Sequence, residues 1–460
     1  MKDCIVVGGG LCGLFSAILL ADKCDSVTLI ESAENCGGLL KSVTDNNNVV
    51  YDQGTHIPNT TGHQAIDDIL FGDATFIKEN WLTINDLPSG SFFNGHWNLA
   101  NQSVDIRHLP EQNYKQAVFE LVSQDQPSDA ENIEDYLRET LGNTITDKVS
   151  LPIVAKLYGN NVDAHQLQRQ SSVNYFGITR VLALGEESSK ALKSSAVFDN
   201  KLSFHNQEDY DAQLRQQNIS KPTYYYPKNG QGIEFWVEHL LNQAKAKGVN
   251  IITSEFVSQI AHQQGKVTEI TLGKSKQCLP CDLLYWSAPP VFGLKAAGMQ
   301  ASAHKAEFRT ANIFYFNFDK PLTNQVAPFL WNWHPSHKTF RITLYPNLRE
   351  QDNGHYNMSV EVVSAPEEAN DITEEMILQE IQEMGLIAKG STLTSSYRQT
   401  INNTFPVPTF DFAKATTENY LAFTEQFDNV IVSGRFSGKQ WFHADVLTSA
   451  YQEISKRFPT

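Results

Sequence analysis

Short apolar runs and longer helical patterns alternate at the start of the chain. Residues 4–7 form a β-branched run that is typical of a strand buried in a parallel sheet. Residues 14–21 follow with the apolar spacing of a helix, and residues 27–30 form a second β-branched run, which Glu31 closes. This order predicts a strand, a turn, a helix and a second strand.

The pattern changes further along the chain. Residues 110–215 read as mostly helical and polar-amphipathic, whereas residues 308–363 alternate apolar and polar positions over several short runs, as in an antiparallel sheet. Towards the C-terminus, residues 429–436 read as a strand and a turn, and residues 444–451 as a helix. A chain of 460 residues can bury a substantial core, and these changes favour two domains over one.

A glycine-rich turn joins the first predicted strand to the first helix. In this GxGxxG pattern, Gly8 permits the tight turn, Gly10 lets the backbone approach a pyrophosphate, and Gly13 lets the helix pack closely on the strand. A diphosphate is then expected on the free amides at the helix N-terminus, where the helix dipole favours negative charge. The residues of the turn expected to bind the cofactor are Gly8, Gly10, Leu11, Cys12 and Gly13.

An acidic residue closes the second predicted strand at the position that dinucleotide recognition requires. Glu31 lies 21 residues after Gly10 and can accept hydrogen bonds from ribose hydroxyls. A carboxylate there also repels a 2'-phosphate, which disfavours NADP. GxGxxG alone is weak evidence, but its place between a strand and a helix, followed by this acid, predicts a dinucleotide-binding domain.

Two further segments distinguish between the dinucleotides. Glu34-Asn35-Cys36-Gly37-Gly38 supplies a second glycine pair, and Asp52-Gln53-Gly54-Thr55-His56 follows another extended segment. Here the chain resembles the amine oxidase, protoporphyrinogen oxidase and UDP-galactopyranose mutase group of flavoproteins. The resemblance implies FAD as cofactor, with Gly37, Gly38 and Leu39 along it and His56 beside the isoalloxazine ring.

Several later blocks extend this resemblance over most of the chain. Residues 152–159 match a P-x-x-x-K-x-x-G element, and residues 224–236 resemble the F-P-x-x-G-G-T-G-x-I-W segment of the mutases. In the group, the residue at Val257 meets the adenine through its backbone, and a C-terminal G-R segment with the following helix lies at the flavin and pyrophosphate. The corresponding cofactor residues here are Gly434, Arg435, Ala444, Asp445 and Val446.

The resemblance also implies the domain organisation. We expect an α/β fold with a discontinuous Rossmann-type FAD/NAD(P)-binding domain built from residues 1–75, 222–300 and 415–460. The inserted substrate domain, residues 76–221 and 301–414, is expected to be α+β, with helices and a mostly antiparallel sheet.

Two arginines are candidate ligands of an anionic substrate. Arg341 lies in a segment that resembles the mutase F-Y-R-x-T-x-x-x-N strand, whose arginine binds the substrate diphosphate, and Arg180 resembles the second diphosphate arginine. A guanidinium suits this task because its planar fork can give two parallel hydrogen bonds to a phosphate. Both arginines can also be read as solvated surface charges.

Two departures from the mutase pattern put a UDP-sugar substrate in doubt. Phe405 stands where the mutase Y-P-x-P-T segment has tyrosine, and Trp441 replaces a second tyrosine. Both tyrosines would have donated hydroxyls to the diphosphate. Phenylalanine has no donor, and an indole donates from a different place.

Charge and composition exclude several classes of function. The formal net charge of −16 argues against a nucleic acid or an anionic membrane as partner, and it leaves an anionic small substrate open because local arginines can override it. The six cysteines form no disulfide framework, and no metal-ligand cluster is evident. No transmembrane segment or signal peptide is expected, and we expect a cytoplasmic protein.

Three functions stay open. The first is an FAD-dependent oxidoreductase that acts on a sugar-like or amine-bearing metabolite, for instance in glycan or cell-surface polysaccharide synthesis. The second is a non-redox, mutase-like enzyme that needs reduced flavin and returns it unchanged, and the third is a flavin-binding assembly subunit without turnover. His56 is the candidate catalytic residue: it can tune the ring or relay a proton, or it packs there without a chemical role.

Overall fold

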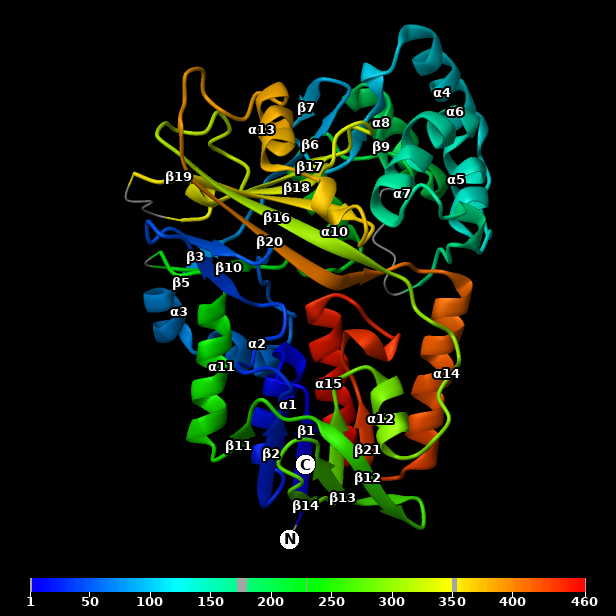
Figure 1. Cartoon of the computed structure of the whole chain (residues 1–460). Coiled ribbons are helices and arrows are strands. Elements are labelled where there is room, and N and C mark those ends of the chain that lie inside the picture. Colours follow the sequence, from blue (N-terminus) through cyan, green and yellow to red (C-terminus); the bar gives the residue numbers. More distant parts are fainter. Residues whose placement is uncertain (1, 172–179, 229, 350–353, 460) are drawn as a thin grey trace.

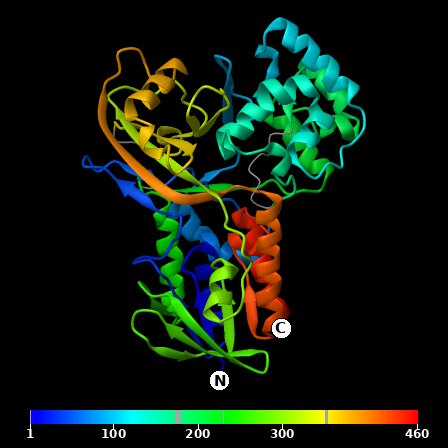
Figure 2. The ribbon, with the colours of Figure 1, turned by 45° about the vertical axis from the view of Figure 1, so that its right-hand side comes forward.

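The structure is a computed structural model that describes residues 2–171, 180–228, 230–349 and 354–459. Figure 1 shows a lower part, which carries both chain termini, and an upper part that is wider and built around a large sheet. In the turned view of Figure 2, the upper part divides into a sheet and a separate group of helices, both above the lower part.

The lower part is built on a five-stranded sheet in which all neighbouring strands are parallel. Its two N-terminal strands and the helix between them are where the hydrophobic pattern predicts them. In sheet order the strands are β11 (Asn250–Ile252), β2 (Ser26–Ile30), β1 (Asp3–Val7), β15 (Leu283–Trp286) and β21 (Val430–Val432). Because strands from three distant segments form one sheet, the expected discontinuous Rossmann-type domain is confirmed.

Apolar residues on the two faces of this sheet pack into two separate cores. On one face lie α1 (Leu11–Ala21), α2 (Gln64–Phe71), α11 (Glu234–Ala246) and α15 (His443–Arg457). On the other face lie β12 (Val257–Gln263), β13 (Lys266–Leu272), β14 (Cys278–Pro280), α12 (Pro290–Ala296) and α14 (Phe410–Gln426). Layers on both faces explain why the strands are apolar throughout and do not alternate.

The upper sheet has seven strands and is antiparallel except for one parallel pair, β17 with β6. The mostly antiparallel sheet expected from the alternation is therefore confirmed. In sheet order the strands are β20 (Leu393–Pro406), β16 (Phe308–Phe318), β19 (Tyr356–Ser364), β18 (Thr339–Leu344), β17 (Phe329–Asn332), β6 (Ser89–Phe93) and β7 (His96–Asn98). Helix α13 (Glu374–Glu383) covers its outer face.

The segment expected to be mostly helical forms the group beside this sheet. Its helices are α4 (Glu111–Ser123), α5 (Ile133–Leu141), α6 (Asn143–Ile145), α7 (Leu151–Tyr158), α8 (Glu186–Lys193), α9 (Ala196–Asp199) and α10 (Gln207–Gln216). Their apolar residues share a core with Phe93 of β6, Phe340 of β18 and Trp333, which follows β17. The upper part is thus α+β, as expected.

Short elements connect the two parts. The hairpin of β3 (Ser42–Thr44) and β4 (Val50–Asp52) lies below the upper sheet, and β5 (Trp81–Ile84) pairs with β10 (Tyr224–Pro227). The expected domain limit at residue 222 falls just before β10, the limit at residue 75 lies inside α3 (Ala74–Asn80), and the limit at residue 415 lies inside α14. These limits stay predictions.

Candidate functional site

The predicted glycine turn lies where three parallel strands of the lower sheet reach their carboxyl ends. Gly8 has a φ of +101°, and a Cβ on it would lie 2.4 Å from the Oγ of Ser287, which follows β15. A Cβ on Gly13 would lie only 1.8 Å from the carbonyl oxygen of Gly8, so helix α1 approaches the turn as closely as a glycine allows. Gly434, after β21, meets the backbone of Ser287 in the same way. Ligands of open parallel sheets bind at such carboxyl ends.

Gly10 differs from its neighbours in the turn. A Cβ built on it meets no atom of the protein within 4 Å, so the space in front of it is open. Gly10 is also the N-cap of α1, where no side chain caps the helix and no acidic residue occupies the first turn. Free amides, a helix dipole and open space together fit a pyrophosphate.

The side chain of Cys12, a predicted residue of this turn, makes its contacts within the protein. The Sγ of Cys12 lies 3.4 Å from the Tyr285 hydroxyl and 3.6 Å from that of Ser433, and burial raises the pKa of the Cys12 thiol. Cys12 and Leu11 can therefore serve a cofactor through their backbone amides.

The Glu31 carboxylate lies beside the glycine turn and has acceptor lone pairs for the hydroxyls of a ribose. Its carboxylate accepts hydrogen bonds from the backbone N–H of Gly9 at 2.6 Å and of Ala33 at 2.8 Å. The segment that leads to Val257 runs beside it, since the Glu255 N–H donates to the Glu31 carbonyl at 3.0 Å. The predicted ribose and adenine contacts thus lie on adjoining chain segments.

The other predicted cofactor residues border the same turn. Gly37 pairs with Gly10 in a short bridge, Gly38 lies against the Gly10 backbone, and Leu39 is 39% exposed beyond them. Helix α15 begins without a side-chain cap, and Ala444, Asp445 and Val446 form its first turn. Helix α15 follows the parallel strand β21 as α1 follows β1, and the two helices pack on each other, so both N-termini lie at the carboxyl-end edge of the lower sheet.

His56 lies between the two parts of the molecule. Its Nε2 is 3.0 Å from the Gln53 carbonyl oxygen, so this nitrogen carries the proton and donates. Burial first, and then the charges of Arg435 and Arg341, lower its pKa to about 4, although Glu361 and the bond to Gln53 raise it. His56 is therefore neutral at physiological pH, with Nδ1 as its basic atom.

A second histidine lies close by that the sequence analysis missed. His443 begins α15, and its Nε2 accepts a hydrogen bond from the Asn59 N–H at 3.4 Å. Burial, and then the charge of Arg435, lower the pKa of His443 to about 4. Arg435 also lies over the ring of Trp441, 5.2 Å from its centroid, so these predicted residues share one region with both histidines.

The structure places Arg341 in an ion pair that the sequence did not indicate. Its Nε and Nη2 donate to the two oxygens of Glu361 at 2.9 and 2.8 Å. Glu361 is 3% exposed and also accepts bonds from Thr55, the residue before His56. Burial raises the pKa of the Glu361 carboxyl, but Arg341 and Thr55 outweigh it and hold that pKa below its usual value.

Arg180 and Phe405 lie in other surroundings. Arg180 donates to the carbonyl oxygens of Asp199 and Leu202 and stacks over Phe204, inside the helical group. Phe405 is half-buried on β20, opposite Arg309. The substrate-binding roles of Arg180, Arg341, Phe405 and Trp441 stay predictions.

Arg309 is a candidate that the sequence analysis overlooked. It is 4% exposed, and the described residues supply neither a hydrogen bond nor an ion pair to its guanidinium, whose Nε is a buried donor without a partner. A Cβ on Gly159, at the end of α7, would lie 3.0 Å from its Nη1. An arginine at the start of an eleven-residue strand with five aromatic residues was the available signal.

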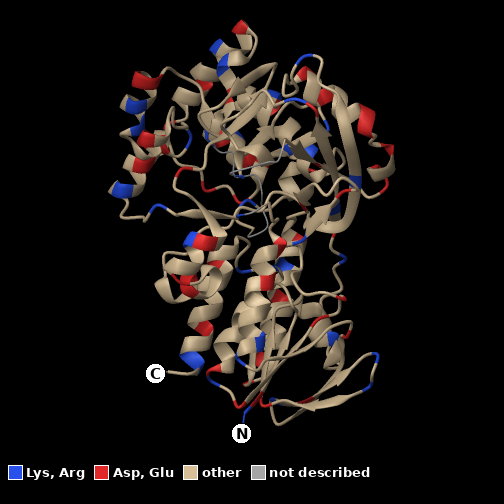
Figure 3. Cartoon of the chain, turned by 90° about the vertical axis from the view of Figure 1, so that its left-hand side faces the viewer, with Lys and Arg blue, Asp and Glu red and all other residues tan. Residues whose placement is uncertain are grey.

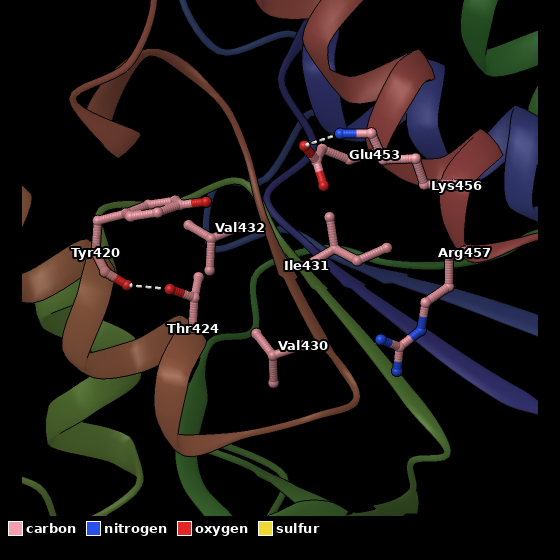
Figure 4. A pocket seen from close by; sticks show the side chains of 8 residues that line it. All are labelled: Tyr420, Thr424, Val430, Ile431, Val432, Glu453, Lys456 and Arg457. Carbon is pink, nitrogen blue, oxygen red and sulfur yellow. Dashed lines mark hydrogen bonds and ion pairs between the residues drawn. The ribbon is translucent and has the colours of Figure 1, made fainter.

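Charge and cavities elsewhere add little to this site. Figure 3 shows acidic and basic residues interspersed over the helices, with no extended cationic face in this view. A cavity of about 340 Å³ lies between α14, the edge strand β21 and α15, lined by Tyr420, Thr424, Val430, Ile431, Val432, Glu453, Lys456 and Arg457 (Figure 4). It contains none of the predicted site residues.

One cluster of side chains has the composition of a metal site. Within the described part of the chain, Glu134, Asp163 and His165 could reach one metal ion, but Asp163 and His165 are exposed, and the cluster belongs to the helical group. Among the described helices, none is both long and apolar enough to cross a membrane.

Comparisons with known proteins agree with the fold. Residues 6–70 match the NAD(P)-binding Rossmann-like domain family. A structure of reduced UDP-galactopyranose mutase has 17% sequence identity and a TM-score of 0.73, with 99% of this chain and 95% of that chain covered. An Exiguobacterium sp. protein assigned as a protoporphyrinogen oxidase has 15% identity and a TM-score of 0.66, covering 99% and 98%.

A redesigned triple mutant of putrescine oxidase has 12% identity and a TM-score of 0.59, with 99% of both chains covered. No curated protein matches the chain by sequence. At these identities the likeness establishes the fold. The chain therefore has the fold of the flavoprotein group that includes the mutase, the protoporphyrinogen oxidase and the amine oxidase, as its motifs predict.

Proposed function

We propose that the chain is an FAD-dependent enzyme that acts on a small, anionic metabolite. The observation that carries the proposal is the open space in front of Gly10, at two free helix N-termini and beside Glu31. Gly8, Gly10, Gly13 and Glu31 would hold the ADP half, and Arg435 with the start of α15 would hold the flavin half. Bound FAD would supply the redox chemistry of the enzyme.

His56 is the candidate catalytic residue of this enzyme. Because it is neutral with an unprotonated Nδ1, it can accept a proton from a substrate at physiological pH. It cannot act as an acid there unless the bound substrate raises its pKa. We infer an oxidoreductase in which the protein supplies binding and a base, acting on a sugar-like or amine-bearing metabolite.

Arg309 supports an anionic substrate. Its guanidinium is buried without a hydrogen bond or ion pair from the described residues, although Glu307, Glu367 and Glu368 attract its charge. Such a group is costly to bury, and a bound anion would supply the missing acceptors. Arg309 lies opposite Phe405, where the mutases place a diphosphate-binding tyrosine. This placement favours one alternative, a mutase-like enzyme acting on a nucleotide sugar.

One experiment addresses cofactor and chemistry together. The protein is denatured and the released flavin identified by chromatography, and metabolites are then screened anaerobically for bleaching of the flavin absorbance. FAD release with bleaching by a metabolite supports the oxidoreductase. FAD release with turnover only of pre-reduced protein, and no net bleaching, supports the mutase, and release of FMN or of no flavin contradicts both.

A further inference from the structure

We propose that Arg341 and Glu361 are positioning residues for His56, which together fix residues 54–56 against the upper sheet. Arg341 and Glu361 lie directly opposite each other on β18 and β19. The bidentate contact between them, at 2.9 and 2.8 Å, joins two strands of the sheet face that looks towards the cofactor cradle. The inference rests on the proposed function, which places His56 beside the cofactor.

The Glu361 carboxylate extends this pair across the junction to the lower part of the molecule. Its Oε1 accepts hydrogen bonds from both the N–H and the hydroxyl of Thr55, each at 2.9 Å. The Thr55 hydroxyl also lies 2.5 Å from that of Thr343 on β18. Oε1 thus accepts three hydrogen bonds, one from Arg341 and two from Thr55, and Oε2 accepts one from Arg341, so donors from both parts of the molecule orient the carboxylate. Its geometry is thereby fixed.

The segment held in this way leads directly to His56. Gly54 has a φ of +90°, and a Cβ there would touch the Glu361 carboxylate at 3.4 Å. Two residues earlier, the Asp52 N–H donates to the Tyr345 hydroxyl at 2.7 Å. The backbone from Asp52 to Thr55 is therefore attached to the upper sheet at two points. Because His56 comes next in the chain, these attachments fix where its ring begins.

The pair also balances charge near His56. Arg341 lowers the pKa of His56 and Glu361 raises it, while burial and Arg435 lower it independently of the pair. Removing one partner leaves the charge of the other uncompensated. The two single substitutions are therefore expected to change this pKa in opposite directions, which a purely structural role or a role as anion ligand does not require.

The test compares Arg341→Gln, Glu361→Gln, the double variant and Arg341→Lys on the protein as purified. The pKa of His56 is measured by NMR on protein with ¹³C-labelled histidine, with the resonance assigned from His56→Gln. Glu134→Gln, which breaks the Arg138–Glu134 pair on helix α5, is the control for losing an ion pair elsewhere. Flavin content and circular dichroism are recorded on every sample.

Arg341→Gln should raise the pKa of His56 and Glu361→Gln should lower it, because Arg341 lowers and Glu361 raises this pKa in the wild-type protein. The double variant should lie between the two, Arg341→Lys close to wild type, and the control at wild type. If Glu361→Gln does not fold, the shift with Arg341→Gln and its recovery with Arg341→Lys decide the question.

Shifts in the same direction, or none, overturn the proposal. Loss of binding of inorganic pyrophosphate in Arg341→Gln, at an unchanged His56 pKa, would instead make Arg341 an anion ligand. The proposed function fails separately: absence of FAD from the wild-type sample refutes it whatever the pKa values are.

Discussion

The cofactor cradle of the lower sheet and the facing surface of the upper sheet are built on different principles. The cradle offers backbone amides and empty space. It needs glycine at Gly8 and Gly13 because a Cβ there would overlap neighbouring atoms. The upper surface offers charged side chains. Arg341 is paired with Glu361, whereas Arg309 has no hydrogen bond or ion pair among the described residues. A cradle of backbone groups binds a constant cofactor, whereas side chains can be exchanged to suit a substrate.

The largest expected effect comes from two neighbouring glycines of the cradle. Gly10→Val should abolish FAD binding and leave the fold intact, because the new side chain enters space that the protein leaves open. Gly13→Ala should instead destabilise the fold, by about 3 kcal/mol or more, since its Cβ would overlap the Gly8 carbonyl. Flavin content and melting temperature separate the two effects.

Gly62 provides the control, because a Cβ there also meets nothing within 4 Å but it lies outside the predicted cofactor residues. Its φ of +81° is unfavourable for alanine, so Gly62→Ala should destabilise the protein by about 1 kcal/mol or more, without loss of flavin. Full FAD content in Gly10→Val would show that the pyrophosphate does not lie in front of this residue.

The same contrast explains what could be predicted from the sequence. The fingerprint at Gly8, Gly10, Gly13 and Glu31 lies within one strand–helix–strand unit, so local pattern and spacing suffice to place it. The alternation from residue 308 onward likewise shows a sheet, because each strand carries its own pattern. The fold was predictable for this reason.

The substrate surface was harder to predict because its contacts depend on register. That Arg341 faces Glu361 follows from the pairing of β18 with β19, and the contact of Glu361 with Thr55 joins residues 306 positions apart. The lack of a partner for Arg309 is a property of the assembled fold. Residue type identified Arg341 as a candidate, but only the structure shows what it binds.

An intermediate effect is expected at Arg309, where function and stability should move in opposite directions. Arg309→Met should weaken the binding of an anionic substrate by about 10- to 150-fold, because each charge-assisted hydrogen bond contributes about 1.5–3 kcal/mol. The same substitution should stabilise the substrate-free protein by about 1 kcal/mol, the lower end of the range for replacing a buried charge, because it removes a guanidinium without hydrogen bonds but also its attraction to Glu307, Glu367 and Glu368. Substrate titration and chemical denaturation measure the two changes.

Arg398 is the matched control for this substitution. It also belongs to the upper sheet and its Nε likewise lacks a partner, but its Nη2 donates to Asn312 and to the Ala369 carbonyl. Arg398→Met should therefore destabilise the protein and leave substrate affinity unchanged. A destabilised Arg309→Met with full affinity would mean that Arg309 is structural and that the anion is bound elsewhere.

The smallest expected effect is a pH dependence that joins the two regions through His56 and His443. In the folded protein the pKa of each is lowered to about 4, whereas an unfolded histidine titrates near 6.5. Above pH 6.5 each histidine is neutral in both the folded and the unfolded protein, so it does not change the free energy of unfolding with pH. Between 6.5 and 4 the unfolded chain binds protons that the folded chain does not, so each histidine should lower the free energy of unfolding by about 1.4 kcal/mol per pH unit as the pH falls.

The measurement is chemical denaturation at pH 7.5, 6.5 and 5.5 for wild type, His56→Gln and His443→Gln. Other histidines with lowered pKa also contribute to the wild-type slope, so the quantity that matters is the difference between variant and wild type; they are His108, His205, His239, His334 and His337. Each variant should lose less stability in acid than wild type does. His165 is the control of opposite sign, because its acidic neighbours raise its pKa and its removal should make the loss slightly larger. If His443→Gln loses as much stability in acid as wild type, then His443 is not buried as a neutral residue at the start of α15, and the junction between the two regions is more open to water than its contacts indicate.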